Sequence, residues 1–208
     1  MTETSELLGP EDPPAVSVDR EAGGSHFFLT CDHAGRAFPR ALGDLGVSAE
    51  DRRRHVAWDV GAAGLALELS RNLDATLVQQ NYSRLVIDSN RPLGNSASIP
   101  VMSEDVVIPG NRDLRPEDIA RRRDEIFKPY HDTIETLLDR RIRANRATTL
   151  VAVHSFTPTF HGKSRPWDIG LLYHREKRLA DALLRILADE AALCVGDNEP
   201  YQVTESED

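Results

Sequence analysis

The sequence predicts an α/β protein with a mixed central sheet, because two kinds of segment alternate along the chain. Short apolar runs rich in β-branched and aromatic residues, typical of buried strands, occur at 25–32 and 148–155. Long amphipathic runs, typical of helices, occur at 47–73 and 115–143. In sheets of this class ligands collect beyond the carboxyl ends of the strands, so the residues that follow each strand are the first candidates for a site.

The N-terminal third contains a predicted leader, a strand and a helix. Residues 1–24 combine prolines, glycines and acids, which indicates a flexible leader before the strand at 25–32. The helix at 47–73 has Ser48 as its candidate N-cap. Gly61 and Gly64 weaken the helix in its middle, and we expect a break near 55–58.

The middle of the chain predicts two more strands, at 74–80 and 83–90, and then a long loop at 92–114 that is rich in Pro, Gly, Asn and Ser. Pro129 is expected to kink or split the helix at 115–143. The last predicted elements are strands at 168–174 and 192–196 around a helix at 175–187. We therefore expect one domain over 25–203, followed by an acidic tail at 204–208.

Composition restricts the class of protein. A chain of 208 residues is long enough for one domain with a real core. The net charge of −9 argues against nonspecific binding to nucleic acid or a membrane surface, since phosphate groups would repel it. Two distant cysteines and an N-terminus without a basic or apolar targeting region favour a reduced, cytoplasmic protein. The sequence leaves the oligomeric state open.

Two predicted strands end in a histidine. His33 follows the strand at 25–32, and His154 lies at the end of the strand at 148–155. Neutral imidazole is the commonest metal ligand, and catalytic zinc sites use three protein ligands. The alternative is that each histidine is a structural residue hydrogen-bonded to a loop.

A third ligand would be a carboxylate, for which Asp32, Asp59 and Asp88 are the candidates. Asp59 lies in the apolar stretch AWDVGAAG, where an unpaired carboxylate would be costly unless a cation lay beside it. The alternative is that Asp59 caps a helix that begins after the break.

A second group of polar residues lies in YSRLVIDSNRP, where Arg84, Asp88 and Asn90 share one face of the predicted strand and Arg91 follows it. Two arginines and an asparagine near a strand end are typical of a small-anion site, because the guanidinium is a planar fork that matches a carboxylate. The alternative is a structural ion pair between Arg84 and Asp88. Arg165, in HGKSRPWDIG, either helps to form a wall of the site or belongs to an ordinary loop.

Taken together, these stretches resemble the N-formylglutamate amidohydrolase family. The matching strings run in order through the chain: CDHAGRAFP, VAWDVGAAGLALEL, YSRLVIDSNRP, IPGN, PYHDTI, VAVHSFTPTFHGKSRPWDIGLLY and VGDNEPY. The resemblance implies a three-layer α/β/α fold of the phosphorylase/hydrolase type, similar to the zinc carboxypeptidases. It also implies a hydrolase that cleaves the amide C–N bond of an N-acyl amino acid such as N-formylglutamate.

The resemblance further implies a bound Zn²⁺ with His33 and His154 as ligands, and we choose Asp59 as the third. Asn90 and Arg91 would hold the substrate carboxylate. Arg84 would help to hold the substrate or polarise its carbonyl, and Arg165 would be a further substrate-binding residue. Zinc would activate a water molecule, and a carboxylate would carry its proton to the leaving amine.

The C-terminal sequence departs from the family pattern. Family members usually continue past GDNEPY to a strand with a glutamate that acts as general base, whereas this sequence ends in QVTESED. Glu199 is still present and is our candidate for the catalytic carboxylate, and one alternative is that the sequence is a truncated product. The other alternative is a catalytically impaired protein that binds small carboxylates without turning them over.

Overall fold

The computed structural model describes residues 6–201, so the predicted tail at 204–208 lies outside the described residues. These residues fall into two compact units that divide after Ser155. The first unit contains a four-stranded sheet, and the second contains short strands and one helix. The single domain expected over 25–203 stays a prediction. Within residues 6–201, every helix is too short or too polar to cross a membrane.

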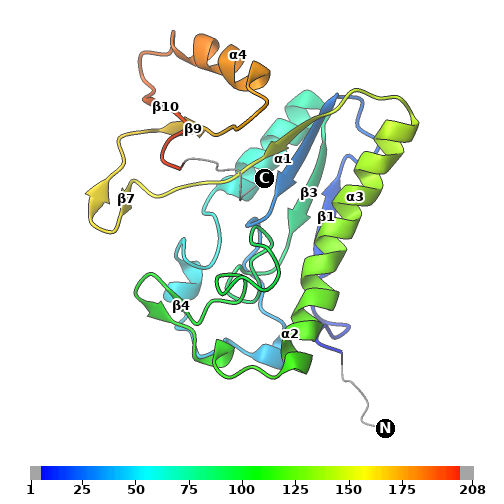
Figure 1. The fold of residues 1–208 in the computed structure, drawn as a ribbon, viewed down its shortest axis with the longest axis vertical. Helices are drawn as coiled ribbons and strands as arrows, with labels where there is room; N and C mark the ends of the chain where they lie inside the picture. The colour runs from blue at the N-terminus through cyan, green and yellow to red at the C-terminus, as the bar shows by residue number, and fades with distance from the viewer. Residues whose placement is uncertain (1–5, 202–208) are drawn as a thin grey trace. The chain divides into compact units, whose positions relative to one another are not determined.

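The sheet of the first unit is mixed, with strand order β1-β3-β2-β6 (Figure 1). Strand β2 is central and runs parallel to both of its neighbours, while β1 is antiparallel to β3. The strands are β1 (Val16–Asp19), β2 (Phe27–Cys31), β3 (Thr76–Gln80) and β6 (Thr149–Ala152). This arrangement confirms the predicted α/β class and mixed sheet.

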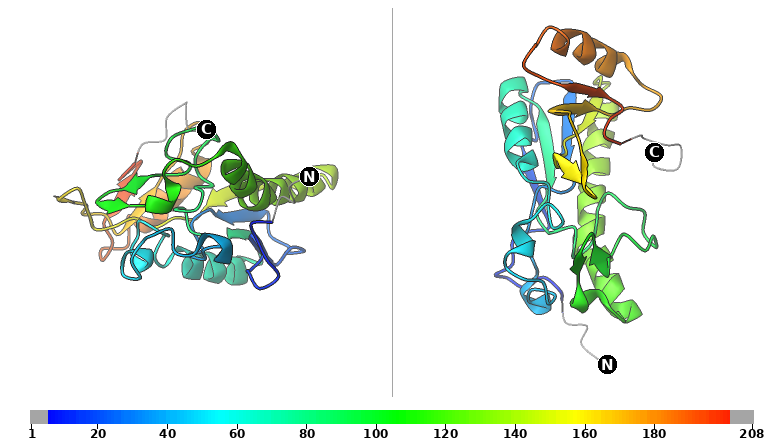
Figure 2. Two further views of the ribbon diagram at one scale, coloured as in Figure 1. Left: turned by 90° about the horizontal axis from the view of Figure 1, so that it is seen from below. Right: turned by 90° about the vertical axis from the view of Figure 1, so that its left-hand side faces the viewer.

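Helices α1 (Ala62–Leu73) and α3 (Lys128–Arg143) cover opposite faces of this sheet (Figure 2). Alternate residues of a strand point to opposite faces, and the core follows this rule. Leu29 and Leu77 pack with the alanines of α1, whereas Phe28 and Val78 pack with α3.

The long predicted helix at 115–143 is divided into two helices, as Pro129 led us to expect. Helix α2 (Pro116–Arg122) and α3 are joined by a π turn, Arg123–Phe127. In this turn the Lys128 N–H donates to the carbonyl of Arg123, five residues earlier. Pro129 has no N–H, so the normal helical hydrogen bond to residue 125 cannot form there.

The expected helix at 47–73 is also interrupted. Only a short 3-10 turn (Asp51–Arg53) and α1 are helical, and the segment between them is irregular, so the predicted break near 55–58 is real. The Asp51 N–H donates to the Ser48 hydroxyl at 3.0 Å.

The segment 83–90, which we predicted to be a strand, is a series of turns. Its backbone groups bond to loops instead of a neighbouring strand, for example Arg84 N–H to Ala57 O and Asp88 N–H to Ser98 O. Burial on all sides produced the strand-like apolar pattern. The loop at 92–114 contains a hairpin of β4 (Met102–Ser103) and β5 (Val106–Val107) and a 3-10 turn, Pro109–Asn111.

The N-terminal segment, expected to be a flexible leader over 1–24, contains β1 and packs on the core through Leu7. The Leu7 and Leu8 N–H groups donate to the Glu125 carboxylate in the π turn, at distances of 2.8–2.9 Å. The sequence of this segment has no periodic signal, because β1 is short and its partner is distant along the chain.

The second unit is built around the parallel pair β9 (Ile169–Leu171) and β10 (Val195–Asp197). Helix α4 (Arg178–Leu187) connects them and contacts β10, so the predicted strand–helix–strand order is confirmed. Strands β7 (Thr159–Phe160) and β8 (Lys163–Ser164) form a small antiparallel hairpin.

Candidate metal and catalytic site

The chain segments that follow β2 and β3 run side by side beyond the sheet. The Gly35 N–H donates to the carbonyl of Gln80 at 2.9 Å, and Ala37 forms a parallel bridge with Tyr82. The parallel pairing of β2 and β6 brings their exits to the same edge of the sheet. This edge is where His33 and His154 were expected to meet.

His33, Asp59 and His154 form a compact group, called here the His-Asp-His cluster. One ligand atom from each residue lies within 4.8 Å of the other two. Asp59 Oδ2 lies 2.9 Å from His154 Nδ1 and 3.6 Å from His33 Nδ1. The Asp59 N–H donates to the His33 carbonyl at 3.0 Å, which holds the two backbones together.

Asp59 does not cap the helix that follows it. Helix α1 has Gly61 at its N-cap, and the helix has no side-chain cap hydrogen bond. The Asp59 carboxylate instead accepts the N–H of Ser155 at 3.1 Å and contacts both histidines. Of the three predicted carboxylate candidates, Asp59 is therefore the one that lies between the histidines.

The other two candidates each contact the outer nitrogen of one histidine. Asp88 Oδ1 lies 2.7 Å from His33 Nε2, and Asp32 Oδ2 lies 3.2 Å from His154 Nε2. Each ring therefore has one nitrogen toward Asp59 and the other on a second carboxylate. Such carboxylate–histidine pairs are common behind metal ligands, because they fix the ring orientation and raise its basicity.

The electrostatics of the site favour ionised carboxylates. Burial raises the pKa of Asp59, but its hydrogen bonds to the two histidines outweigh burial and hold that pKa well below its usual range. Burial lowers the pKa of His154, but hydrogen bonds to Asp32 and Asp59 outweigh it and raise the pKa to about 9. The pKa values of Asp32 and Asp88 are lowered for the same reason, because the contacts with His154 and His33 outweigh burial.

Arg84 also reaches the His-Asp-His cluster. Its Nη2 contacts Asp59 Oδ1 and His33 Nδ1, while its Nε is buried with no hydrogen-bond partner among the described residues. The alternative of a structural Arg84–Asp88 ion pair does not hold, since the carboxylate that Arg84 contacts is Asp59.

The donor set fits a divalent transition metal. Two imidazoles and one carboxylate are common ligands of catalytic zinc, and that set leaves a fourth position for water or substrate. Three carboxylates surround the histidines, so a bound cation would offset the repulsion between these negative charges, as Arg84 does. The residues present therefore suit a metal, although the donor set alone does not identify the ion.

Asn90 and Arg91 lie exposed just beyond this group. The Asn90 N–H donates to Asp88 Oδ1 at 2.8 Å, the same oxygen that contacts His33. Arg91 Nη1 donates to the Asn90 carbonyl at 3.1 Å. The predicted anion-binding residues are thus connected to the cluster through one carboxylate, although they do not share a strand face.

The remaining predicted site residues belong to the second unit. Arg165 lies between the rings of Phe160 and Tyr201, at 4.4 and 4.7 Å from their centroids, and donates to the Tyr201 hydroxyl at 3.1 Å. Glu199 follows β10 and precedes a cis peptide bond to Pro200.

Sequence reasoning missed the part played by Tyr130. This fully buried tyrosine on α3 donates its hydroxyl to Asp32 Oδ1. The string PYHDTI contributed to the family resemblance, but nothing local to it indicated a contact with a residue 98 positions away.

Cys31 lies two residues before His33 but is not suited to act as a nucleophile. Cys31 is fully buried, and burial together with the charges of Asp32 and Asp59 raises the pKa of its thiol to about 12. A thiol that stays protonated is a poor nucleophile. Cys31 and Cys194 are both free.

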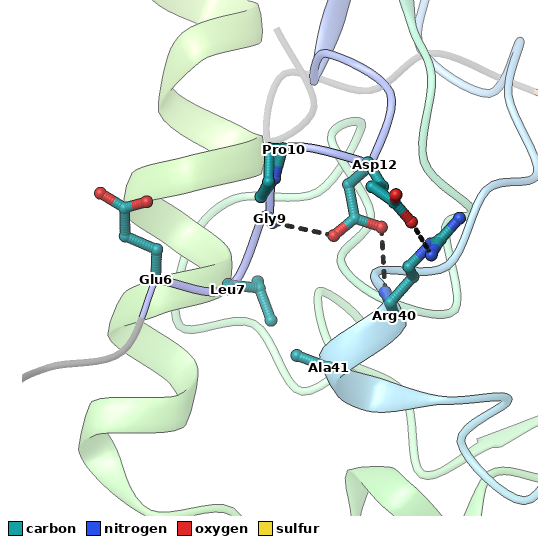
Figure 3. A pocket seen from close by; sticks show the side chains of 8 residues that line it. Glu6, Leu7, Gly9, Pro10, Asp12, Arg40 and Ala41 are labelled. Atoms are coloured by element: carbon teal, nitrogen blue, oxygen red, sulfur yellow. Dashed lines mark hydrogen bonds and ion pairs between the residues drawn. The ribbon is translucent and has the colours of Figure 1, made fainter.

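Two surface hollows lie apart from the His-Asp-His cluster. The first, about 230 Å³, is formed where the N-terminal segment meets Arg40 (Figure 3). There Asp12 accepts the N–H groups of Gly9 and Arg40 at 2.9 and 3.0 Å, which closes the turn onto the core. The second, about 270 Å³, is lined by Arg36, Ala49, Arg52 and Arg53.

Comparison with known proteins relates this geometry to a family. The model of the N-formylglutamate amidohydrolase family matches residues 25–207. The solved structure of a gene product from Agrobacterium tumefaciens is 40% identical, with a TM-score of 0.90 over 95% of this chain and 78% of that chain. N-formylglutamate amidohydrolase from Ralstonia eutropha is 17% identical, with a TM-score of 0.71 over 91% of this chain and 78% of that chain. The comparison with curated proteins gives no match.

The family model covers nearly the whole chain, and both solved structures share its fold over more than nine-tenths of its length. The resemblance noted in the sequence is therefore confirmed: the protein is a hydrolase that belongs to the N-formylglutamate amidohydrolase family.

Proposed function

We propose that this protein is a zinc-dependent amidohydrolase that cleaves the amide C–N bond of an N-acyl amino acid, with N-formylglutamate as the leading substrate. The observation that carries the proposal is the His-Asp-His cluster, whose ligand atoms lie within 4.8 Å of one another at a strand edge. Family membership supports the substrate class.

The cluster is built to hold a cation in a fixed geometry. His33, Asp59 and His154 would be the ligands, and Asp88 and Asp32 hold the outer ring nitrogens. When bound, zinc would supply a Lewis acid that lowers the pKa of a coordinated water and polarises the substrate carbonyl.

The substrate would be held by the residues next to the cluster. Asn90 and Arg91 are exposed and offer an amide and a guanidinium for the amino-acid carboxylate. Arg84 is already held by Asp59 and His33, and its side chain is 25% exposed, so its guanidinium would donate to the acyl oxygen. A donor fixed in advance stabilises the negative charge that develops on that oxygen. We also propose Arg165 as a further substrate contact.

A proton must also move from the attacking water to the leaving amine. Asp32, Asp59 and Asp88 are each engaged with a histidine, which leaves them poorly suited to this step. We assign the step to Glu199, the candidate catalytic carboxylate named from the sequence, and the assignment is tested separately from the metal site.

The first test compares the full chain with His33→Ala and with His26→Ala. His26 is a histidine that stacks on Phe27 and lies outside the cluster, so it is a matched control. We expect about one zinc per chain and N-formylglutamate hydrolysis in the parent and in His26→Ala. His33→Ala should lose both zinc and at least about 1,000-fold in kcat/KM, since one ligand of three is removed. Activity that survives complete chelation in the parent would contradict the proposal.

The second test replaces Glu199 with Gln and measures zinc content, substrate binding by calorimetry, and turnover. Loss of turnover of about 100-fold or more with zinc and substrate affinity kept supports the proton-transfer role. Unchanged turnover removes Glu199 from the mechanism. If the parent chain binds N-formylglutamate without hydrolysing it, the amidohydrolase proposal fails and the carboxylate-binding alternative holds.

A further inference from the structure

His33 and His154 are not held in the same way. The side chain of His33 is 5% exposed, so packing restricts its ring, whereas that of His154 is 31% exposed. A half-exposed ring keeps more rotational freedom than a buried one. The orientation of His154 therefore depends on its polar contacts.

His154 contacts a carboxylate on each side: its Nδ1 is hydrogen-bonded to Asp59, and its Nε2 forms an ion pair with Asp32. Asp32 Oδ2 lies 3.2 Å from His154 Nε2, and the second oxygen of Asp32 accepts the hydroxyl of Tyr130. On the His33 side, Asp88 is held in a comparable way by the N–H of Asn90. Each outer carboxylate thus contacts a histidine and also accepts a second donor, which fixes its rotation.

Tyr130 is a rigid support for this contact. Its side chain is 0% exposed and packs in the core with Phe28, Val78 and Leu137, so the ring cannot move away from Asp32. It lies on α3 three residues after the π turn, and π turns are frequent near functional sites because one extra residue shifts the helix face.

We propose that Asp32 and Tyr130 are positioning residues for the metal site: Tyr130 fixes the Asp32 carboxylate, and Asp32 fixes the His154 ring with Nδ1 toward Asp59. This inference rests on the proposed metal site. A structural role for Tyr130 in the core alone would leave metal affinity unchanged when only its hydroxyl is removed.

The test measures zinc affinity by competition with a chelator for full-length parent, Asp32→Asn and Tyr130→Phe. Asp32→Asn keeps the size of the side chain, but it replaces one carboxylate oxygen by an amide nitrogen and removes the negative charge. We expect a loss of zinc affinity of about 10- to 100-fold for Asp32→Asn and about 10-fold for Tyr130→Phe. The double variant should lose less than the product of the two single losses, because both act through one ring.

Tyr82→Phe is the matched control. Tyr82 is equally buried, and its hydroxyl donates to the Pro13 carbonyl at 2.6 Å, away from the cluster. It should lose thermal stability but keep parent zinc affinity. Zinc affinities of Asp32→Asn and Tyr130→Phe within about 2-fold of the parent, or a loss in Tyr82→Phe as large as in Tyr130→Phe, would overturn the inference.

A second measurement separates this inference from the proposed function. In metal-free protein with ¹⁵N-labelled histidine, the His154 Nε2 proton should exchange slowly in the parent and in Tyr82→Phe. It should exchange faster in Asp32→Asn and Tyr130→Phe. A parent that binds no zinc but shows this pattern refutes the proposed function and supports the positioning contact, whereas equal exchange rates in all four proteins refute the contact itself.

Discussion

Individual buried polar residues organise the segments around the site. Asn111 is an example, because its side chain is almost fully buried and both its amide nitrogen and its amide oxygen form hydrogen bonds. Its Nδ2 donates to the carbonyls of Leu85 and Pro100 at 2.8 and 2.7 Å, and its Oδ1 accepts from Arg122 at 2.7 Å. One side chain therefore joins the turns after β3, the loop at 92–114 and helix α2.

Replacement of Asn111 by Ala should lower the free energy of unfolding by about 3 kcal/mol, because buried carbonyls and a buried guanidinium lose their partner. Urea denaturation measures this change. Asn95→Ala is the control: Asn95 is exposed and its side chain accepts the Ala97 N–H at 2.8 Å, so its loss should be about 0.5 kcal/mol. An equal loss of unfolding free energy in both variants would show that the burial of Asn111 does not increase its contribution to stability.

At the scale of elements, the site depends on how closely the exits of β2 and β3 approach. A Cβ on Gly35 would lie 2.0 Å from the Asn81 carbonyl oxygen, so only glycine permits this approach. Since His33 and Arg84 lie on these two exits, the spacing of the exits sets the spacing of the site.

Gly35→Ala should therefore force the exits apart, destabilise the fold by about 3 kcal/mol and weaken zinc binding. Gly64 offers the opposite case, because it lies in α1 with open space where the Cβ of an alanine would be. Gly64→Ala should stabilise the protein by about 0.5–1 kcal/mol through helix propensity and leave zinc binding unchanged. Denaturant titration and zinc affinity of both variants test this; a Gly35→Ala protein with parent affinity would contradict the close-approach argument.

At the scale of the whole molecule, the cluster joins three separate parts of the first unit. His33 follows β2, Asp59 precedes α1, and His154 follows β6, so a metal bound there would connect segments up to 121 positions apart in the sequence (33 to 154). A ligand that binds only the folded state stabilises it by mass action.

Zinc at 100 times its Kd should therefore raise the stability of the parent by about 2.7 kcal/mol, seen as a higher Tm by calorimetry. Chelation should reverse the shift. His33→Ala should show no shift with zinc, whereas His26→Ala should behave like the parent. A zinc-dependent Tm in His33→Ala would mean that the metal binds elsewhere.

The sequence by itself determined the class of fold, the order of most elements and the two strand-end histidines of the cluster, with Asp59 as one of three carboxylate candidates. Alternating apolar strands and amphipathic helices are local patterns, and a histidine or aspartate placed at a strand exit can be read from one short segment. The family motifs in the sequence were also sufficient to identify the family that the comparison confirms.

The tertiary structure decided what depends on contacts between distant residues. It placed Asp59 between the histidines, assigned Asp32 and Asp88 to their outer nitrogens, and brought Tyr130 to Asp32. It also showed that 83–90 is a set of turns, because a segment buried on all sides has the apolar pattern of a strand without a strand to pair with. Hydrogen-bond partners that lie 50 to 100 residues away leave no periodic trace in the sequence, so only the folded arrangement specifies them.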